Sequence, residues 1–129
     1  MMYLKKFRLL ESVIYKSLYH GTNKEFDEFS NEFLKDGVEV RYGEGFYFTE
    51  NINEAKEFGD IILVAELTIE NAFIWEEEQM KELDSMGIKY DKYTNMGGNL
   101  KRKTDYDAII NGDVYIVFDA NQIKITGQV

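Results

Sequence analysis

One histidine, His20, is the residue that most directly suggests chemistry, because a glycine and a hydroxyl follow it at once in the segment LYHGT. The 129 residues contain no other histidine and no cysteine. Thiolate nucleophiles, disulfides and sulfur-ligated zinc are therefore excluded, as are zinc sites built from several histidines. A metal site built only from carboxylates stays open, but no spacing motif predicts one. His20 is therefore either a buried core residue or a single group that hydrogen-bonds a ligand.

Three further segments could join His20 in one site: GEGFYFT, AKEFG and DVYIVFDANQIKI. Singly, each has a simpler reading. GEG lacks the third glycine and the following helix of a dinucleotide-binding fingerprint, and the aromatic residues Tyr47 and Phe58 are consistent with an ordinary core. Gly21, directly after the histidine, allows a ligand to approach the backbone N–H and C=O closely. The order of the segments carries more information than any one of them.

In this order the segments resemble the three-part signature of the ADP-ribosyltransferase superfamily, in its diphtheria toxin and poly(ADP-ribose) polymerase branch. That branch has His-Gly on a first strand and a tyrosine in a G-x-G-x-Y-F strand, followed by a helix with a second aromatic. A glutamate opens a late E-Y-V-V-F-D strand. The resemblance covers residues 18–125. It implies an α+β fold of the ADP-ribosyltransferase type, with two small, mostly antiparallel sheets packed together and short flanking helices.

The resemblance also implies a role for individual residues toward NAD, the co-substrate of the family. His20 would hydrogen-bond the adenosine ribose, and the backbone of Gly21 would pair with the nicotinamide carboxamide. Tyr47 and Phe58 would sandwich the nicotinamide ring, since aromatic faces suit a flat, cationic ring. Thr22, next to Gly21, is assigned to the same cofactor site.

The sequence departs from the family at the late strand, where Val114 stands in the place of the glutamate and makes the triad His-Tyr-Val. Valine cannot accept a hydrogen bond from the ribose. Asp113 is one residue earlier, and adjacent strand residues face opposite ways, so Asp113 reaches the pocket only through a bulge. Three readings follow: a mono-ADP-ribosyltransferase that relies on another acid, a transferase with Asp113 as its catalytic acid, and an inactive module that binds NAD, ADP-ribose or a partner.

The charge balance bears on the acceptor of the transferred group. With 15 basic and 24 acidic residues the net charge is -9, which argues against a broad phosphate-tracking surface and favours a protein acceptor over nucleic acid. A basic cluster of Lys101, Arg102 and Lys103 is the candidate substrate-recognition element. The N-terminus has no signal-peptide pattern and no apolar run spans a membrane, which predicts a cytoplasmic protein resembling small bacterial or phage effectors, toxins included, that modify intracellular targets.

A single domain over residues 1–129 must position these residues. Apolar periodicity predicts an amphipathic helix over residues 1–16 and helical turns carrying rings at 26, 29 and 33. The segment from Asn51 to Phe58 reads as a helix with a capping box to Glu54, and residues 76–87 read as a charged helix. Residues 89–107, with Gly97 and Gly98, are expected to form a polar loop. The expected strands are 17–21, 45–49, 60–69, 72–75, 107–111, 114–118 and 122–126.

Overall fold

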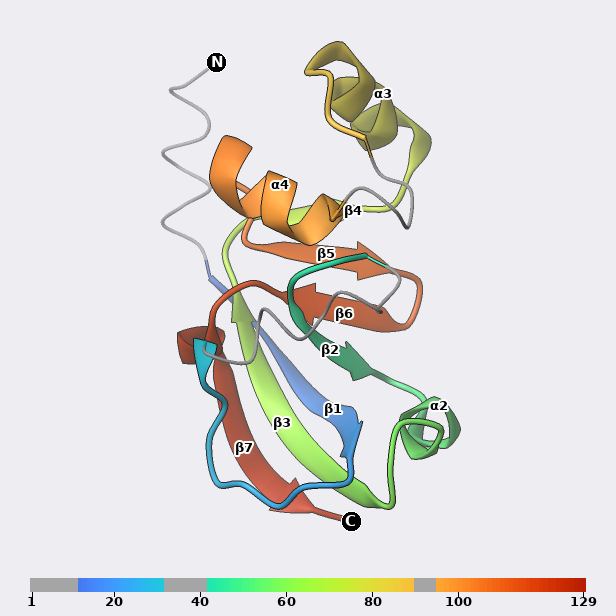
Figure 1. Cartoon of the computed structure of the whole chain (residues 1–129), viewed down its shortest axis with the longest axis vertical. Coiled ribbons are helices and arrows are strands. Elements are labelled where there is room, and N and C mark those ends of the chain that lie inside the picture. Colours follow the sequence, from blue (N-terminus) through green and yellow to red (C-terminus); the bar gives the residue numbers. More distant parts are fainter. Residues whose placement is uncertain (1–11, 32–41, 90–94) are drawn as a thin grey trace.

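The structure is a computed structural model that describes residues 12–31, 42–89 and 95–129 (Figure 1). Its strands are β1 (Val13–Thr22), β2 (Phe46–Thr49), β3 (Ile61–Ile69), β4 (Ala72–Ile74), β5 (Ala108–Asn111), β6 (Val114–Val117) and β7 (Ile123–Gln128). Its helices are α2 (Ile52–Lys56), α3 (Glu77–Ser85) and α4 (Met96–Lys103), with a 3-10 turn, η2 (Ala120–Gln122). The mixed α+β class is confirmed.

The strands form one sheet in the order β4-β5-β6-β2-β1-β3-β7. All neighbours are antiparallel except β4 and β5, so the expectation of mostly antiparallel pairing is confirmed. The expected division into two separate sheets is not found among the described strands. Strand β2 is only four residues long and meets β1 at one residue pair, Tyr19 with Thr49. The sheet is therefore continuous, but narrow where its two halves meet.

Side chains alternate along the strands and separate two core clusters, one on each face of the sheet. The first core cluster consists of Leu18, Phe46, Phe48, Ala65, Leu67, Ile69, Ala108, Tyr115 and Val117. The second core cluster consists of Tyr42, Phe73, Leu83, Ile88, Met96, Leu100, Ile109, Ile116 and Phe118. On β2, Phe46 and Phe48 belong to the first cluster, whereas Tyr47 packs against the second. Helices α3 and α4 supply Leu83, Met96 and Leu100 to the second cluster.

The helix expected over the first sixteen residues is wrong where the structure describes the chain. Residues 1–11 lie outside the described part, but strand β1 already begins at Val13. Val13 pairs with Ile69 of β3, and the next two residues continue the same ladder. Branched side chains favour strands, and long-range pairing here overrides a helical spacing of apolar residues.

The helical turns expected around the phenylalanines are also wrong within residues 24–30, which form bends. Their rings still pack as predicted: Phe26 and Phe29 meet edge to face, with ring centres 4.9 Å apart. Phe33, the third ring, lies outside the described residues. The spacing of these residues is therefore explained by the packing of their rings on the sheet and not by a helix.

The polar loop expected over residues 89–107 is wrong over 96–103, which form helix α4; residues 90–94 lie outside the described part. Asn95 caps the helix by accepting a hydrogen bond from the Gly98 N–H at 3.2 Å. Gly97 lies so close to the carbonyl oxygen of Glu44 that a Cβ there would overlap it. The two glycines suggested a loop, but one of them lets a helix pack closely.

The other predicted elements are confirmed within one to a few residues of their expected bounds, including helix α2 with Asn51 as its N-cap. The capping box expected with Glu54 does not form. Instead, the Asn51 N–H donates to the Thr49 hydroxyl at 3.0 Å. The Thr49 hydroxyl in turn donates to the Glu54 carboxylate at 2.9 Å.

Candidate active site

Strand β1 places His20 at the centre of the sheet, beside β2. Its Nδ1 lies 2.7 Å from the backbone carbonyl oxygen of Tyr47. A carbonyl only accepts, so Nδ1 carries the proton and the lone pair of the neutral ring is on Nε2. The ring packs against Phe29 and Phe48, with centres 5.0 and 5.3 Å away. Nε2 makes no hydrogen bond to the described residues. Phe48 belongs to the first core cluster and Phe29 packs against it, so the His20 ring lies on the face of the sheet opposite the Tyr47 side chain.

The protonation of His20 gives a first testable prediction. Burial lowers its pKa more than the hydrogen bond to the Tyr47 carbonyl raises it. Because His20 is the only histidine, its ring signals in an NMR titration are unambiguous. We expect the Nδ1–H tautomer and a midpoint below the ordinary value of 6.5. A midpoint above that value would contradict the described environment of the ring.

The same shift has a consequence for stability. The unfolded imidazole binds its proton near pH 6.5, whereas the folded one binds it only at lower pH. The free energy of unfolding should therefore fall as the pH drops from that value and level off below the folded pKa. His20→Gln should flatten this part of a melting-temperature profile.

Gly21 lies directly beneath helix α2. A Cβ built on Gly21 would overlap the carbonyl oxygen of Ala55 and would lie 3.3 Å from the Cβ of Phe58. The Phe58 side chain is 64% exposed. An apolar ring of that size in solvent beside a bare backbone provides a stacking surface for a flat ligand. Thr22, the next residue, accepts a hydrogen bond from the Lys24 N–H at 3.2 Å and helps to end the strand.

The Tyr47 hydroxyl is hydrogen-bonded to two backbone groups of the turn that precedes β2. It donates to the Gly43 carbonyl and accepts from the Tyr42 N–H, both at 2.9 Å. Burial raises the pKa of Tyr47 well above its ordinary value, and its hydrogen bond to the Tyr42 backbone opposes this shift. The ring stacks on Tyr42, with centres 6.3 Å apart. No ring contact joins it to Phe58 in the described structure, so the expected sandwich would need a ligand between them.

Helix α4 braces this turn from outside. The Asn95 side chain accepts from the Glu44 N–H at 2.7 Å and donates to the Glu44 carboxylate at 2.9 Å. The Gly97 N–H donates to the Tyr42 carbonyl at 2.7 Å. Asn95 adopts a left-handed backbone, with φ of 48°, which asparagine tolerates better than most residues. The turn and Tyr47 are thus fixed by a helix that the sequence did not predict.

Val114 begins strand β6 and pairs with Thr49 of β2 and Asn111 of β5 without a bulge. It packs against the second core cluster, as Tyr47 does. Asp113 is on the turn just before β6. Burial raises the pKa of Tyr115, and the charges of Glu50 and Asp113 add to the shift. Tyr115 belongs to the first core cluster, on the face opposite Val114, and no bulge at Val114 brings Asp113 to the Val114 face.

Glu54 is the polar residue near this position that the sequence analysis did not assign to the site. Thr49 is the register partner of Val114, and its side chain is 7% exposed. Its hydroxyl donates to Glu54 at 2.9 Å. The sequence contained a weak signal for this contact, a hydroxyl residue five positions before an acid across a helix start. That signal was outweighed by the capping-box pattern.

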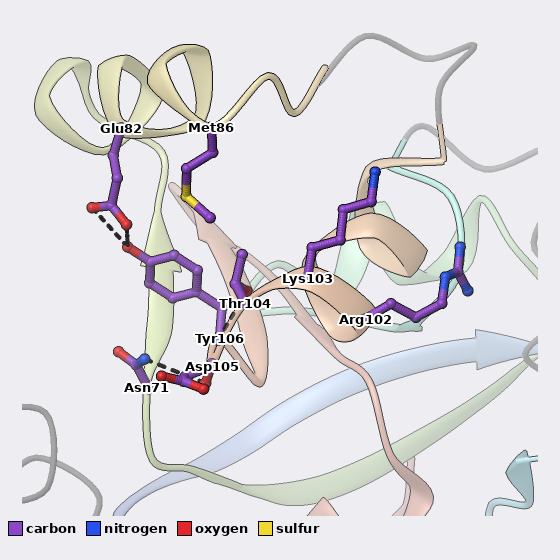
Figure 2. Close-up of a pocket in the computed structure, with 8 residues that line it drawn as sticks. All are labelled: Asn71, Glu82, Met86, Arg102, Lys103, Thr104, Asp105 and Tyr106. Atoms are coloured by element: carbon purple, nitrogen blue, oxygen red, sulfur yellow. Dashed lines mark hydrogen bonds between the residues drawn. The ribbon is translucent and has the colours of Figure 1, made fainter. Parts of the chain in front are cut away.

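The basic cluster lies elsewhere on the molecule. Lys101, Arg102 and Lys103 form the exposed last turn of α4, at the β4 end of the sheet, whereas α2 lies beside β1 and β2 (Figure 1). Arg102 pairs with Glu44 at 3.5 Å. Figure 2 shows Arg102 and Lys103 beside an open pocket of about 380 Å³ between α3 and α4. The tertiary structure does not bring this cluster together with His20.

No group of three or more potential metal ligands occurs within residues 12–31, 42–89 and 95–129. None of the helices described there is long and apolar enough to cross a bilayer.

Comparison with known proteins identifies the family of the chain. The protein family described as "ADP-Ribosyltransferase in polyvalent proteins" matches residues 15–128. No curated protein matches the chain. Among solved structures, the crystal structure of an anti-CRISPR protein is similar over 92% of this chain and 96% of that chain, with 15% sequence identity and a TM-score of 0.49.

The three resembling segments lie on the adjacent strands β1, β2 and β6, and the family match spans nearly the whole chain. The class of protein is an ADP-ribosyltransferase domain. Within that class, the chain belongs to the family of ADP-ribosyltransferases in polyvalent proteins, and NAD is the substrate of such enzymes.

Proposed function

We propose that the protein is a mono-ADP-ribosyltransferase that binds NAD through His20, Gly21, Tyr47 and Phe58. The observation that carries the proposal is the junction of β1 and β2. There the His20 ring is fixed on the Tyr47 carbonyl at 2.7 Å, and Gly21 lies bare beneath α2 beside the exposed ring of Phe58. In this proposal the nicotinamide ring stacks beside Phe58 and Gly21, and a ribose hydroxyl bonds to His20.

The reaction does not require a strong proton donor. The bond from ribose C1′ to the nicotinamide nitrogen breaks, and its electron pair leaves with neutral nicotinamide. A nucleophile of the acceptor forms the new bond to C1′ and releases its proton to a nearby base or to water. The protein must hold NAD in a reactive pose and stabilise positive charge at the sugar. A neutral His20 serves the first task as a hydrogen-bonding group.

The acceptor is proposed to be an intracellular protein. The net charge of -9 disfavours a nucleic-acid surface, and Lys101 and Lys103 offer exposed cations to an acidic protein. Transfer is expected to stop after one ADP-ribose, because chain elongation in the family relies on the glutamate that Val114 replaces. A role as a bacterial or phage effector that acts in the cytoplasm fits this chemistry.

The absence of a carboxylate at Val114 favours one alternative, an inactive domain that binds NAD or ADP-ribose. One experiment separates the two functions. The purified chain is incubated with adenylate-labelled NAD and a bacterial lysate, and labelled protein and released nicotinamide are measured. A labelled band that disappears in His20→Ala supports transfer. If no macromolecule is labelled and no nicotinamide is released, the transferase proposal is wrong. In that case, a higher melting temperature in the presence of NAD would support the alternative of an inactive domain that binds NAD.

A pair of Tyr47 variants tests the stacking role proposed for its ring. Tyr47→Ala should abolish transfer, because it removes the ring. Tyr47→Phe should keep most of the transfer activity and lose about 1 kcal/mol of stability, since it removes only the hydroxyl bonds to Tyr42 and Gly43. Equal loss of activity in both variants would mean that the hydroxyl, and not the ring, is what NAD requires. Chemical denaturation measures the stability and nicotinamide release the activity.

A further inference from the structure

Two carboxylates on the segment that follows β2, Glu50 and Glu54, accept hydrogen bonds that place them on different faces of the sheet. Glu50 accepts a hydrogen bond from the Tyr115 hydroxyl at 2.7 Å, and Asp113 acts on that same tyrosine. Because Tyr115 belongs to the first core cluster, this bond engages Glu50 on the face opposite Val114. No bulge at Val114 turns the preceding Asp113 to the Val114 face. Glu57 is exposed at the end of α2.

Glu54 is bonded on the other face. Thr49 alternates with Phe48 along β2, so its side chain lies on the face of Tyr47 and Val114. Directly opposed residues of an antiparallel pair have Cβ atoms about 5 Å apart, and Thr49 is the residue opposed to Val114. Its hydroxyl donates to Glu54 at 2.9 Å. The carboxylate of Glu54 is thus hydrogen-bonded to the residue that pairs with Val114, the position at which the family has its glutamate.

Helix α2 also brings Glu54 to the groups proposed to hold nicotinamide. The neighbouring residue, Ala55, has its carbonyl against Gly21. The Phe58 N–H donates to that carbonyl at 3.1 Å, so Phe58 continues the same turn. Glu54 is only partly buried, and a ligand at Gly21 and Phe58 can therefore approach it. The short helix α2 and the turn that follows it thus carry an oriented acid and the stacking ring.

We infer that Glu54 is the catalytic carboxylate of this enzyme and replaces the acid missing at Val114. This inference rests on the proposed function. As the bond from C1′ to nicotinamide breaks, positive charge develops on the ribose, and a fixed carboxylate beside it stabilises that charge. The hydroxyl of Thr49 holds the carboxylate in one orientation. No proton transfer from Glu54 is required, because nicotinamide leaves neutral.

Glu54→Gln tests the inference, because the amide oxygen can still accept from the Thr49 hydroxyl while the charge is removed. With the full chain, labelled NAD and a bacterial lysate, we expect kcat for nicotinamide release to fall about 100-fold. KM for NAD and the melting temperature should stay close to those of the unmodified protein. Glu57→Gln removes one charge from the same helix and should leave kcat unchanged.

The outcomes separate this inference from the function on which it rests. If the unmodified chain releases no nicotinamide, the proposed function fails and the inference fails with it. If the unmodified chain is active and Glu54→Gln is as active as Glu57→Gln, Glu54 is only a structural cap and the transferase stands. A fall in melting temperature that accounts for the lost activity of Glu54→Gln would also overturn the catalytic role.

Discussion

Gly21→Ala is expected to destabilise the fold by about 3 kcal/mol and to abolish NAD binding. The new methyl group would overlap the carbonyl oxygen of Ala55 and lie 2.8 Å from its carbonyl carbon. A backbone carbonyl cannot rotate away as a flexible side chain can. Helix α2 would have to lift from the sheet, and Phe58 and Glu54 would move with it. Urea unfolding and the NAD-induced shift in melting temperature measure the two effects.

Gly127→Ala supplies the matched control for this variant. Gly127 lies in a strand as Gly21 does, but no atom lies within 4 Å of a Cβ built there. The control should unfold at nearly the same urea concentration as the unmodified protein and bind NAD equally well. Equal stability of the two variants would show that α2 does not pack closely on Gly21. The assignment of Gly21 to the proposed nicotinamide site would then be contradicted.

The strands that the sequence predicted correctly are those whose side chains face the core on one or both sides. The run IILVAELTI became β3 because branched apolar residues suit a sheet that is covered on both faces. The order of the His-Gly, G-x-G-x-Y-F and Y-I-V-F segments also predicted their neighbourhood. No local pattern contains the fact that β1, β2 and β6 are adjacent in the sheet; the resemblance to a family implied only that the segments meet in one site.

The failures have a common physical origin in long-range contacts. Val13 and Ile14 keep a helical spacing, yet they pair with Ile69 and Thr68 of a distant strand. Gly97 reads as a breaker, yet it permits α4 to pack against Glu44. In each case a partner more than fifty residues away decides the local conformation, and a local reading of propensity cannot include that partner.

The contact between Thr49 and Glu54 was missed for a different reason. Both residues are near in sequence, and the acid occupies the third position after the Asn51 cap, where a capping box is the usual expectation. The Thr49 hydroxyl intervenes and takes the role of acceptor for the Asn51 N–H. The acid is thereby released from the cap and directed toward the face of Val114 by a single side chain.

Placing a glutamate at Val114 should restore the activity that Glu54→Gln loses. In the family the acid occupies this strand position, and the regular pairing of Val114 with Thr49 indicates that a longer side chain there would share the face of Tyr47. We expect Val114→Glu combined with Glu54→Gln to release nicotinamide at least about tenfold faster than Glu54→Gln alone, which corresponds to about 1.4 kcal/mol in the barrier.

Val114→Gln combined with Glu54→Gln is the control for this rescue, because it matches the shape of the glutamate without its charge. It should be no faster than Glu54→Gln. In the otherwise unmodified chain, Val114→Glu should give a smaller gain than in the Glu54→Gln background, since two carboxylates so close together disfavour one another's ionised form. The unmodified chain, Glu54→Gln, Val114→Glu and the combination of these two substitutions form a double-mutant cycle whose coupling energy reports whether the two positions act on the same charge.

An additive result would carry its own meaning. If Val114→Glu raised nicotinamide release by the same factor with and without Glu54, the two carboxylates would act independently and Glu54 would not stand in for the missing acid. If the rescue occurs and the gain is largest in the Glu54→Gln background, Glu54 on helix α2 performs the role that the family's glutamate performs on strand β6. The Thr49 hydroxyl would then be the group that made the move possible, because it joins the two positions across the sheet.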